Sequence, residues 1–375
     1  MKILLTGGGT GGHFYPLIAV ARAINSVADQ EKIAKLELTY MAEKPYDRNL
    51  LLQNGIKFKK VYSGKMRRYF SLLNIVDLFK LGPGLLKSVT GMYFDFPDVV
   101  FSKGGYDSFP ALFAAKILGI PVMIHESDAI PGKANLWAGK FARRIAVSFP
   151  SAAESFPKEK TAVTGNPARK EFFIRDTLGA KEFFKLETDV PTIFVFGGSQ
   201  GARIINDNLL DGIAELIQDY QVIHQTGEKN YEECRGRAEI ILADSKFKQR
   251  YKAFPFLRFD EMRIAYGAAE MVVSRAGGSA IFEIAASGLP SIIIPIFESA
   301  QDHQRENAYS YAKSGAAVVI EENNLKPHIL KSEIDRIFSS KEEMKAMSEA
   351  AKLFAKPDAA EKIAREIIRL AIEHK

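Results

Sequence analysis

The chain has 375 residues, of which 47% are hydrophobic and 26% are charged, the composition of a folded protein. Because the length exceeds that of one ordinary core, two domains are expected. The single cysteine, Cys234, excludes an internal disulfide and a multi-cysteine metal site, and it suits a reducing cytoplasm. No apolar run approaches the roughly 18 residues of a membrane span, so we expect a cytoplasmic chain that is not threaded through a bilayer.

The net charge of +6 is unevenly distributed along the chain. Residues 57–87 hold eight Lys and Arg against one Asp, a local charge of +7, so the remainder nets −1. Apolar residues at helical spacing follow the basic cluster: Leu72, Ile75, Val76 and Phe79. Such a basic amphipathic segment favours contact with an anionic membrane surface, the alternative being an ordinary helix packed on the core beside a solvated basic loop. Base-stacking aromatics on strands are not apparent, so no nucleic-acid partner is expected.

Short apolar runs alternate with helical patterns throughout the chain. The expected strands are residues 2–6, 35–41, 97–102, 120–126 and 144–149 in the first half, and 192–198, 220–227, 251–256, 270–277, 290–296 and 316–320 in the second. Continuous apolar strands separated by helices indicate parallel sheets that are covered on both faces. The predicted fold class is therefore α/β, with two doubly wound, Rossmann-like domains.

The expected domain boundary lies where Gly165, Asn166 and Pro167 break the pattern. We therefore expect an N-terminal domain over 1–165 and a C-terminal domain over 166–356. A last helix within 357–375 carries apolar residues on one face and is expected to pack back on the first domain.

Three strand-to-helix turns are rich in glycine: residues 7–13, 197–203 and 274–283. Turns of this kind lie at the carboxyl ends of strands and present backbone N–H groups to ligands, so two domains facing each other across them would form a cleft suited to a pyrophosphate. The first turn also has the G-x-G-x-x-G spacing of a nicotinamide oxidoreductase, with Glu43 as the acidic residue after the second strand. That alternative leaves the second and third turns without a purpose.

Several polar residues beside these turns could act on a ligand. Glu283 lies about one turn into the third helix and could bind a ribose diol, although a solvated helix glutamate is as common. Residues 300–308 place Asp302, His303, Gln304 and Asn307 where sugar hydroxyls could be bound, or where they simply cap a helix. His13 opens the first helix, where a neutral imidazole is favoured, as a general base requires. No histidine, cysteine or carboxylate pattern predicts a metal site.

Taken together, the motifs resemble the MurG family. They are GGTGGHFYP, KGGYDSFP, HESDAIPGKAN, TGNPAR, GGSQGAR, SRAGGSAIFEIAASGLP and AQDHQRENA, in this order. The resemblance implies a glycosyltransferase-B fold and an inverting transfer without cofactor or catalytic metal. N-acetylglucosamine would move from UDP-N-acetylglucosamine to the C4 hydroxyl of undecaprenyl-pyrophosphoryl-N-acetylmuramyl-pentapeptide, in peptidoglycan synthesis. It also implies a bacterial, peripheral protein on the cytoplasmic face of the cell membrane.

The resemblance implies donor contacts on Thr10, Gly11, Gly12, Arg169, Ser199, Phe259 (backbone, for the uracil), Gly278, Ser279, Ala280, Ile281, Phe282, Glu283 and Gln304. His13 matches the histidine proposed on the acceptor side. Ser127 and Asp128 stand where the family has Gln-Asn, which makes Asp128 a second candidate base and substrate contact. The third turn carries smaller residues than in other members, so its backbone contacts are the ones expected to persist. The remaining alternatives are another lipid-directed hexosyltransferase, such as one that glycosylates diacylglycerol, and a nucleotide-sugar-binding regulator without turnover.

Overall fold

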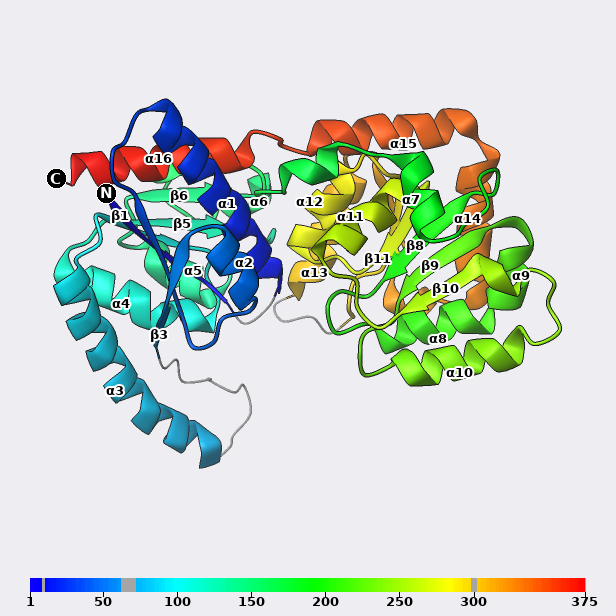
Figure 1. Cartoon of the computed structure of the whole chain (residues 1–375), viewed down its shortest axis with the longest axis horizontal. Coiled ribbons are helices and arrows are strands. Elements are labelled where there is room, and N and C mark those ends of the chain that lie inside the picture. Colours follow the sequence, from blue (N-terminus) through cyan, green and yellow to red (C-terminus); the bar gives the residue numbers. More distant parts are fainter. Residues whose placement is uncertain (9–10, 62–71, 298–301, 375) are drawn as a thin grey trace. The chain divides into compact units, whose positions relative to one another are not determined.

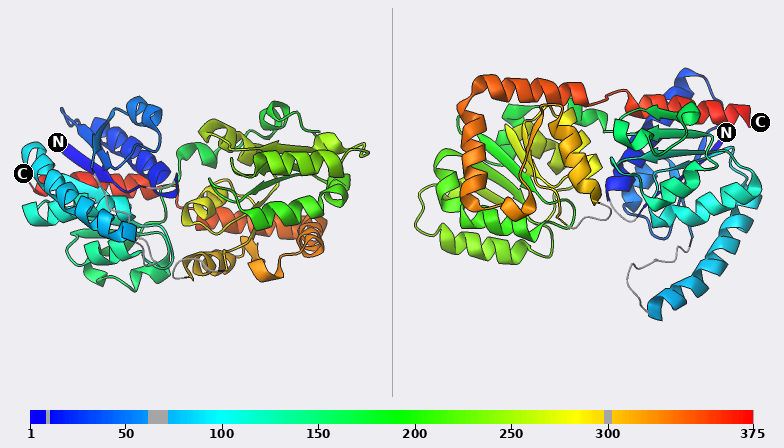
Figure 2. Two further views of the ribbon diagram at one scale, coloured as in Figure 1. Left: turned by 90° about the horizontal axis from the view of Figure 1, so that it is seen from below. Right: turned by 180° about the vertical axis from the view of Figure 1, so that it is seen from behind.

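The computed structural model describes residues 1–8, 11–61, 72–297 and 302–374. The chain forms two compact units: unit 1 comprises Met1–Ala168 and Lys356–Lys375, and unit 2 comprises Arg169–Ala355. Each unit contains one parallel sheet with helices on both faces (Figures 1 and 2). The predicted fold class is confirmed, and the two units are described separately below.

The sheet of unit 1 has the strand order β3-β2-β1-β4-β5-β6-β7, and all its pairs are parallel. Its strands are β1 (Lys2–Thr6), β2 (Glu37–Ala42), β3 (Ile56–Lys60), β4 (Val99–Ser102), β5 (Val122–Glu126), β6 (Arg144–Val147) and β7 (Thr161–Val163). Its helices are α1 (Gly11–Gln30), α2 (Arg48–Gln53), α3 (Leu72–Asp95), α4 (Phe109–Leu118), α5 (Lys133–Gly139), α6 (Pro150–Ala153) and α16 (Ala359–Glu373), with 3-10 turns η1 (Tyr106–Ser108) and η2 (Lys158–Lys160).

Alternate residues of β1 pack into two different cores. Ile3 and Leu5 belong to a cluster with α1 and α16, whereas Leu4 belongs to a cluster with α3, α4 and α5. The apolar face of α16 is buried against α1, beside which it lies in Figure 1. Arg365 of α16 also donates hydrogen bonds to Glu31 and Gln30. The end of the chain therefore completes the core of unit 1.

The sheet of unit 2 has the strand order β10-β9-β8-β11-β12-β13 and is also parallel. Its strands are β8 (Thr192–Phe196), β9 (Gln221–Gln225), β10 (Tyr251–Phe254), β11 (Met271–Ser274), β12 (Ser291–Ile293) and β13 (Ala317–Val319). Its helices are α7 (Thr177–Phe183), α8 (Arg203–Asp211), α9 (Ile213–Asp219), α10 (Tyr231–Ile241), α11 (Phe259–Ala268), α12 (Gly278–Ala286), α13 (His303–Ala312), α14 (Pro327–Ser339) and α15 (Lys341–Phe354), with 3-10 turns η3 (Lys170–Phe173), η4 (Lys248–Arg250) and η6 (Glu322–Asn324).

Strand β8 shows the same alternation as β1. Ile193 and Val195 face a cluster with α8, α9 and α14. Phe194 and Phe196 face the other way, onto the ring of Tyr266 in α11, with ring centroids 5.4 Å and 6.0 Å away. A strand that is apolar from Ile193 to Phe196 is thus buried on both faces, as the sequence pattern predicted.

All eleven strands predicted from the sequence are present, most of them shorter than the apolar runs. The structure adds β3 and β7, the two edges of the first sheet. The basic segment 57–87 accordingly begins in a strand, where Lys57 pairs with Glu37 at 3.2 Å and Lys59 pairs with Asp95. The predicted helix over 72–79 is part of α3. The basic cluster around Lys65 lies outside the described residues.

Candidate active site

The connections of each sheet reverse direction between two central strands, β1 and β4 in unit 1 and β8 and β11 in unit 2. Ligands bind in open α/β sheets at the carboxyl ends of such strands. The three predicted glycine turns follow β1, β8 and β11, and a fourth glycine pair, Gly104 and Gly105, follows β4. Each of the four central strands therefore ends in a glycine-rich turn.

Three of the expected donor-binding residues come together in unit 2. The Arg169 guanidinium lies between two aromatic rings, 3.9 Å from the centroid of Phe259 and 4.5 Å from that of Phe172. Its Nη2 donates to Oε1 of Glu283 at 3.2 Å. The Arg169 and Glu283 side chains are only 5% and 14% exposed. This buried ion pair links residues 114 positions apart, and no local sequence pattern indicates it.

The protonation of the Glu283 carboxyl depends on its ion pair with Arg169. Burial raises the pKa of the Glu283 carboxyl, and the neighbouring Arg169 opposes this shift. The hydroxyl of Tyr266 is buried nearby and has no hydrogen-bond partner among the residues that the structure describes, and its pKa is raised by burial and by the Glu283 carboxylate. A ribose diol that binds Glu283 would therefore share the carboxylate with Arg169.

The third glycine turn limits which atoms of α12 can face a ligand. Ile281 is fully buried and Phe282 is 2% exposed, its ring packing on that of Phe354 with centroids 4.9 Å apart. Gly278 is also buried, whereas Ser279 and Ala280 are partly exposed. The side chains of Ile281 and Phe282 therefore do not face a ligand.

Two polar residues of α13 have structural partners. Asn307 is fully buried and donates to the Ala276 carbonyl at 3.0 Å, so it fixes the third glycine turn, and of the two roles expected for residues 300–308 its own is structural. Oε1 of Gln304 accepts from the Ile296 backbone N–H at 3.3 Å, which places its side chain beside the end of β12. Asp302 and His303 are partly exposed at the start of the same helix.

The second glycine turn is compact, and its Ser199 is exposed. Gly198 and Gly201 have φ values of 88° and 75°, which other residues rarely adopt. A side chain on Gly201 would collide with the Thr226 carbonyl oxygen, at 2.0 Å. The glycines are needed here for close backbone approach.

In unit 1 the loops after β1 and β4 touch. Gly7 has a φ of 130°, and a Cβ on it would lie 2.9 Å from the Cβ of Lys103. A Cβ on Gly105 would lie 3.7 Å from Nε2 of His13, which is half-buried near the start of α1. Gly11 and Gly12 open the same helix, and Thr10 lies outside the described residues.

Asp128 follows β5 and is half-buried. The carboxylate of the preceding Glu126 accepts four hydrogen bonds, from the backbone N–H groups of Ser127, Asp128 and Gly132 and from Asn135 Nδ2. Burial raises the pKa of Glu126, with the Asp128 carboxylate adding to the shift. Glu126 thus fixes the loop that presents Asp128.

Sequence reasoning missed two buried cations directly after the central strands. Lys103 follows β4 and Arg275 follows β11, in the similar stretches VVFSKGG and MVVSRAGG. Arg275 donates to the carbonyls of Ile294 and Pro295 and, at 2.6 Å, to Glu322. The repeated order of serine, cation and paired glycines was the signal that could have identified them.

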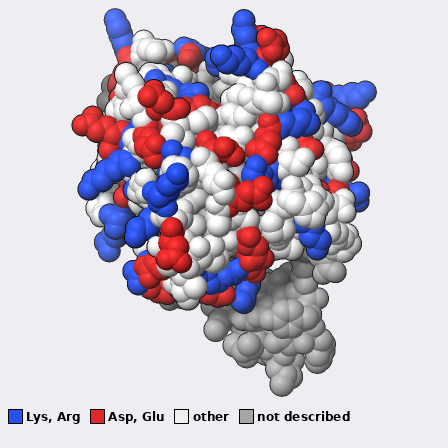
Figure 3. Space-filling view, turned by 90° about the vertical axis from the view of Figure 1, so that its right-hand side faces the viewer, with Lys and Arg blue, Asp and Glu red and all other residues white. Residues whose placement is uncertain are grey.

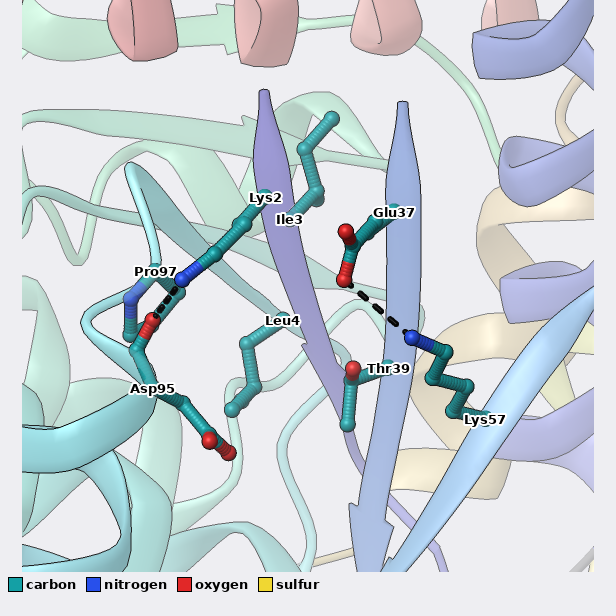
Figure 4. A pocket seen from close by; sticks show the side chains of 8 residues that line it. All are labelled: Lys2, Ile3, Leu4, Glu37, Thr39, Lys57, Asp95 and Pro97. Carbon is teal, nitrogen blue, oxygen red and sulfur yellow. Dashed lines mark hydrogen bonds and ion pairs between the residues drawn. The ribbon is translucent and has the colours of Figure 1, made fainter. Parts of the chain in front are cut away.

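A pocket of about 120 Å³ lies away from these turns, at the amino ends of the strands in unit 1 (Figure 4). Its charged groups are already paired: Lys57 with Glu37, and Lys2 Nζ with the Asp95 carbonyl at 2.7 Å. Since ligands bind such sheets at the carboxyl ends, this pocket is not the active site.

Among the residues that the structure describes, no three His, Cys, Asp or Glu side chains gather as metal ligands. In that same part of the chain, no helix has both the length and the apolar character needed to cross a bilayer. On the face in Figure 3, basic and acidic side chains lie next to one another without a patch of single sign.

Comparison with known proteins agrees with this geometry. The N-terminal and C-terminal domain models of glycosyltransferase family 28 match residues 3–147 and 192–363. A relative from Treponema denticola is 37% identical over 344 residues, covering 87% of this chain and 85% of its own. A relative from Listeria welshimeri is 34% identical over 370 residues, covering 98% of this chain and 99% of its own.

Both relatives are named UDP-N-acetylglucosamine–N-acetylmuramyl-(pentapeptide) pyrophosphoryl-undecaprenol N-acetylglucosamine transferase. The crystal structure of Acinetobacter baumannii MurG has the same fold, with a TM-score of 0.73 at 24% identity over 98% of this chain and 99% of that one. This chain therefore belongs to glycosyltransferase family 28 and, within it, to the MurG family.

Proposed function

We propose that this protein transfers N-acetylglucosamine from UDP-N-acetylglucosamine to the C4 hydroxyl of undecaprenyl-pyrophosphoryl-N-acetylmuramyl-pentapeptide. The observation that carries the proposal is the likeness to transferases of that name along nearly the whole chain, both units included. The glycine turns at the central strands of both units add physical support, because they offer N–H groups to a nucleotide pyrophosphate and to sugars.

Unit 2 binds the donor in this proposal. Glu283 accepts hydrogen bonds from the ribose diol while Arg169 holds its carboxylate, and the backbone at Phe259 contacts the uracil. Ser199, Gln304 and the turn from Gly278 to Phe282 contact the rest of the donor. The N-termini of α8 and α12 offset the charge that develops on the pyrophosphate as UDP leaves.

Unit 1 binds the acceptor and supplies the base. The C4 oxygen attacks the anomeric carbon, its proton passes to the base, and the bond to UDP breaks with inversion of configuration. His13 is the proposed base, and Asp128 is the second candidate. Thr10, Gly11 and Gly12 let the sugars approach the backbone of the first turn.

The acceptor is a lipid, and we assign membrane contact to the segment 57–87, on the cytoplasmic face of an anionic membrane. Apolar side chains at the end of this segment and just beyond it in α3 support this, since Leu86, Tyr93 and Phe94 are 66%, 63% and 82% exposed. Each basic side chain near such a surface contributes about 1 kcal/mol.

Replacing the basic cluster by serine is expected to abolish sedimentation with anionic vesicles at low salt and to leave UDP binding intact. The changes are Lys65→Ser, Arg67→Ser and Arg68→Ser. Unchanged vesicle binding would assign membrane contact to another surface.

The proposed reaction is tested by transfer of label from UDP-N-acetylglucosamine to defined lipid acceptors. Label should appear in the undecaprenyl-linked muramyl pentapeptide and not in diacylglycerol. Transfer to diacylglycerol alone would replace the proposal with another hexosyltransferase activity. UDP release that never exceeds one equivalent would indicate a binding protein without turnover.

A further inference from the structure

A lysine side chain is buried at the centre of unit 1, although nothing in the proposed mechanism uses it. Lys103 is fully buried, and its Nζ has three partners. These are Nδ1 of His125 at 2.6 Å, Oγ of Ser127 at 2.6 Å and Oδ1 of Asn166 at 2.9 Å. An ammonium group has three N–H donors, so every one of them is used.

The partners also fix the state of His125. Its Nε2 lies 3.0 Å from the Gly165 carbonyl oxygen, which can only accept, so Nε2 carries the proton. Nδ1 therefore accepts from Lys103, and the ring is neutral. Burial and the adjacent ammonium both lower the pKa of His125 well below its ordinary value. The network thus holds one cation among neutral acceptors.

These contacts join three segments that are distant in the sequence. Lys103 follows β4, His125 is the last but one residue of β5 with Ser127 just beyond the strand, and Asn166 lies in the loop after β7. All three segments belong to the carboxyl edge of the sheet, where ligands are expected. One ammonium group therefore holds together much of this edge of unit 1.

The loops that Lys103 holds are those next to the two candidate bases. Gly105, two residues further on, lies beside the imidazole of His13, since a Cβ on Gly105 would be 3.6 Å from the ring. Ser127 directly precedes Asp128, whose carboxylate interacts electrostatically with the Lys103 ammonium. A shift of either loop would move a candidate base relative to the acceptor.

We propose that Lys103 is a positioning residue of the acceptor half of the reaction, which holds the loops after β4, β5 and β7 in one arrangement beside His13 and Asp128. The inference rests on the function proposed above. Lys103 itself has no exposed atom and therefore does not contact substrate. Its effect should appear in the acceptor parameters and leave donor binding unchanged.

Lys103→Met removes the charge and keeps the length of the side chain. A matched control is Lys181→Met, since Lys181 of unit 2 is also buried and has three oxygen partners, from Thr188, Val190 and Glu270. In Lys103→Met, kcat/KM for the lipid acceptor should fall at least tenfold, with the KM for UDP-N-acetylglucosamine within twofold of the parent. Lys181→Met should change neither the acceptor kcat/KM nor the KM for UDP-N-acetylglucosamine by more than twofold. Acceptor kcat/KM within twofold of the parent in folded Lys103→Met would overturn the proposal.

A second variant and a second readout keep the test decisive. If Lys103→Met does not fold, Ser127→Ala removes one of the three partners and should lower acceptor kcat/KM in the same way but less; unchanged parameters would overturn the inference. The ¹⁵N resonance of His125 Nδ1 should shift in whichever variant folds, because its hydrogen bond changes, and no shift would contradict the network. The NMR measurement needs no substrate, so it tests the Lys103 network independently of the proposed function. If the parent protein transferred sugar to no lipid, that result would contradict the proposed function and not the network.

Discussion

Lys103→Met should alter how the stability of unit 1 depends on pH. Burial lowers the pKa of Lys103 to about 7, although the Glu126 and Asp128 carboxylates oppose the shift. A lysine in the unfolded chain has a pKa of about 10.4. Between these two values the unfolded state binds more protons than the folded state, so the free energy of unfolding rises with pH.

The magnitude follows from the two pKa values. Each pKa unit corresponds to about 1.4 kcal/mol, so the contribution of Lys103 should rise by about 2 to 3 kcal/mol between roughly pH 6 and pH 9. Below about pH 7, lysine is protonated in both states and the contribution is constant. The variant lacks this group, so its stability relative to the parent should be highest at low pH and decrease as pH rises.

Urea denaturation provides the assay. Trp137, the single tryptophan, lies in α5 of unit 1, with its ring 5.0 Å from that of Phe109 and 4.9 Å from that of Phe141. Its fluorescence therefore reports the unfolding of unit 1. The other titratable groups facing Lys103, which are His125, Glu126 and Asp128, are present in both proteins, so the difference between parent and variant contains Lys103 and its interactions with them. If the difference in free energy of unfolding between parent and variant is the same at pH 6 as at pH 9, the reasoning is refuted.

Three further predictions address the site and the core. His13→Ala should lower turnover by about two to four orders of magnitude, as expected for loss of a general base; a loss below about tenfold, with Asp128→Asn inactive, would assign the base to Asp128. Glu283→Ala should weaken UDP binding by about 1.5 to 3 kcal/mol, and equal affinities by calorimetry would remove the ribose role. Ile367→Ala should destabilise unit 1 by about 2 to 5 kcal/mol, because Ile367 is fully buried between α16 and α1; Trp137 fluorescence measures this change, and an effect below about 1 kcal/mol would contradict the packing.

The strands that the sequence failed to predict are the two edges of one sheet. β3 has the sequence IKFKK and β7 has TAV, and neither is the apolar run typical of a strand buried on both faces. An edge strand has a neighbour on one side only and tolerates lysines, which also discourage pairing with other chains. The apolar pattern therefore identified every interior strand, and the lysines of β3 were attributed to the basic segment instead.

The candidate site could be predicted only in part. Glycine turns are local, so their positions after β1, β8 and β11 followed directly from the sequence. The pairing of Arg169 with Glu283 depends on packing between distant segments, which no local pattern encodes. Asn307 is a different case: the sequence left open whether residues 300–308 bind a sugar or cap a helix, and the Asn307 side chain turns inward to a backbone carbonyl.

The two buried cations suggest why the halves of the protein should respond differently to pH. Arg275 donates to the Glu322 carboxylate, whose other oxygen accepts from the Phe297 N–H at 2.7 Å, and these contacts lower the pKa of Glu322. A guanidinium paired with an ionised carboxylate keeps its charge at neutral pH. Among the described residues the direct partners of Lys103 are neutral, and burial lowers its pKa to about 7, so it can lose its proton. Raising the pH from 7 to 9 should therefore reduce the affinity for the lipid acceptor while UDP affinity measured by calorimetry stays constant. A parallel loss of both affinities would mean that the two halves do not differ in this way.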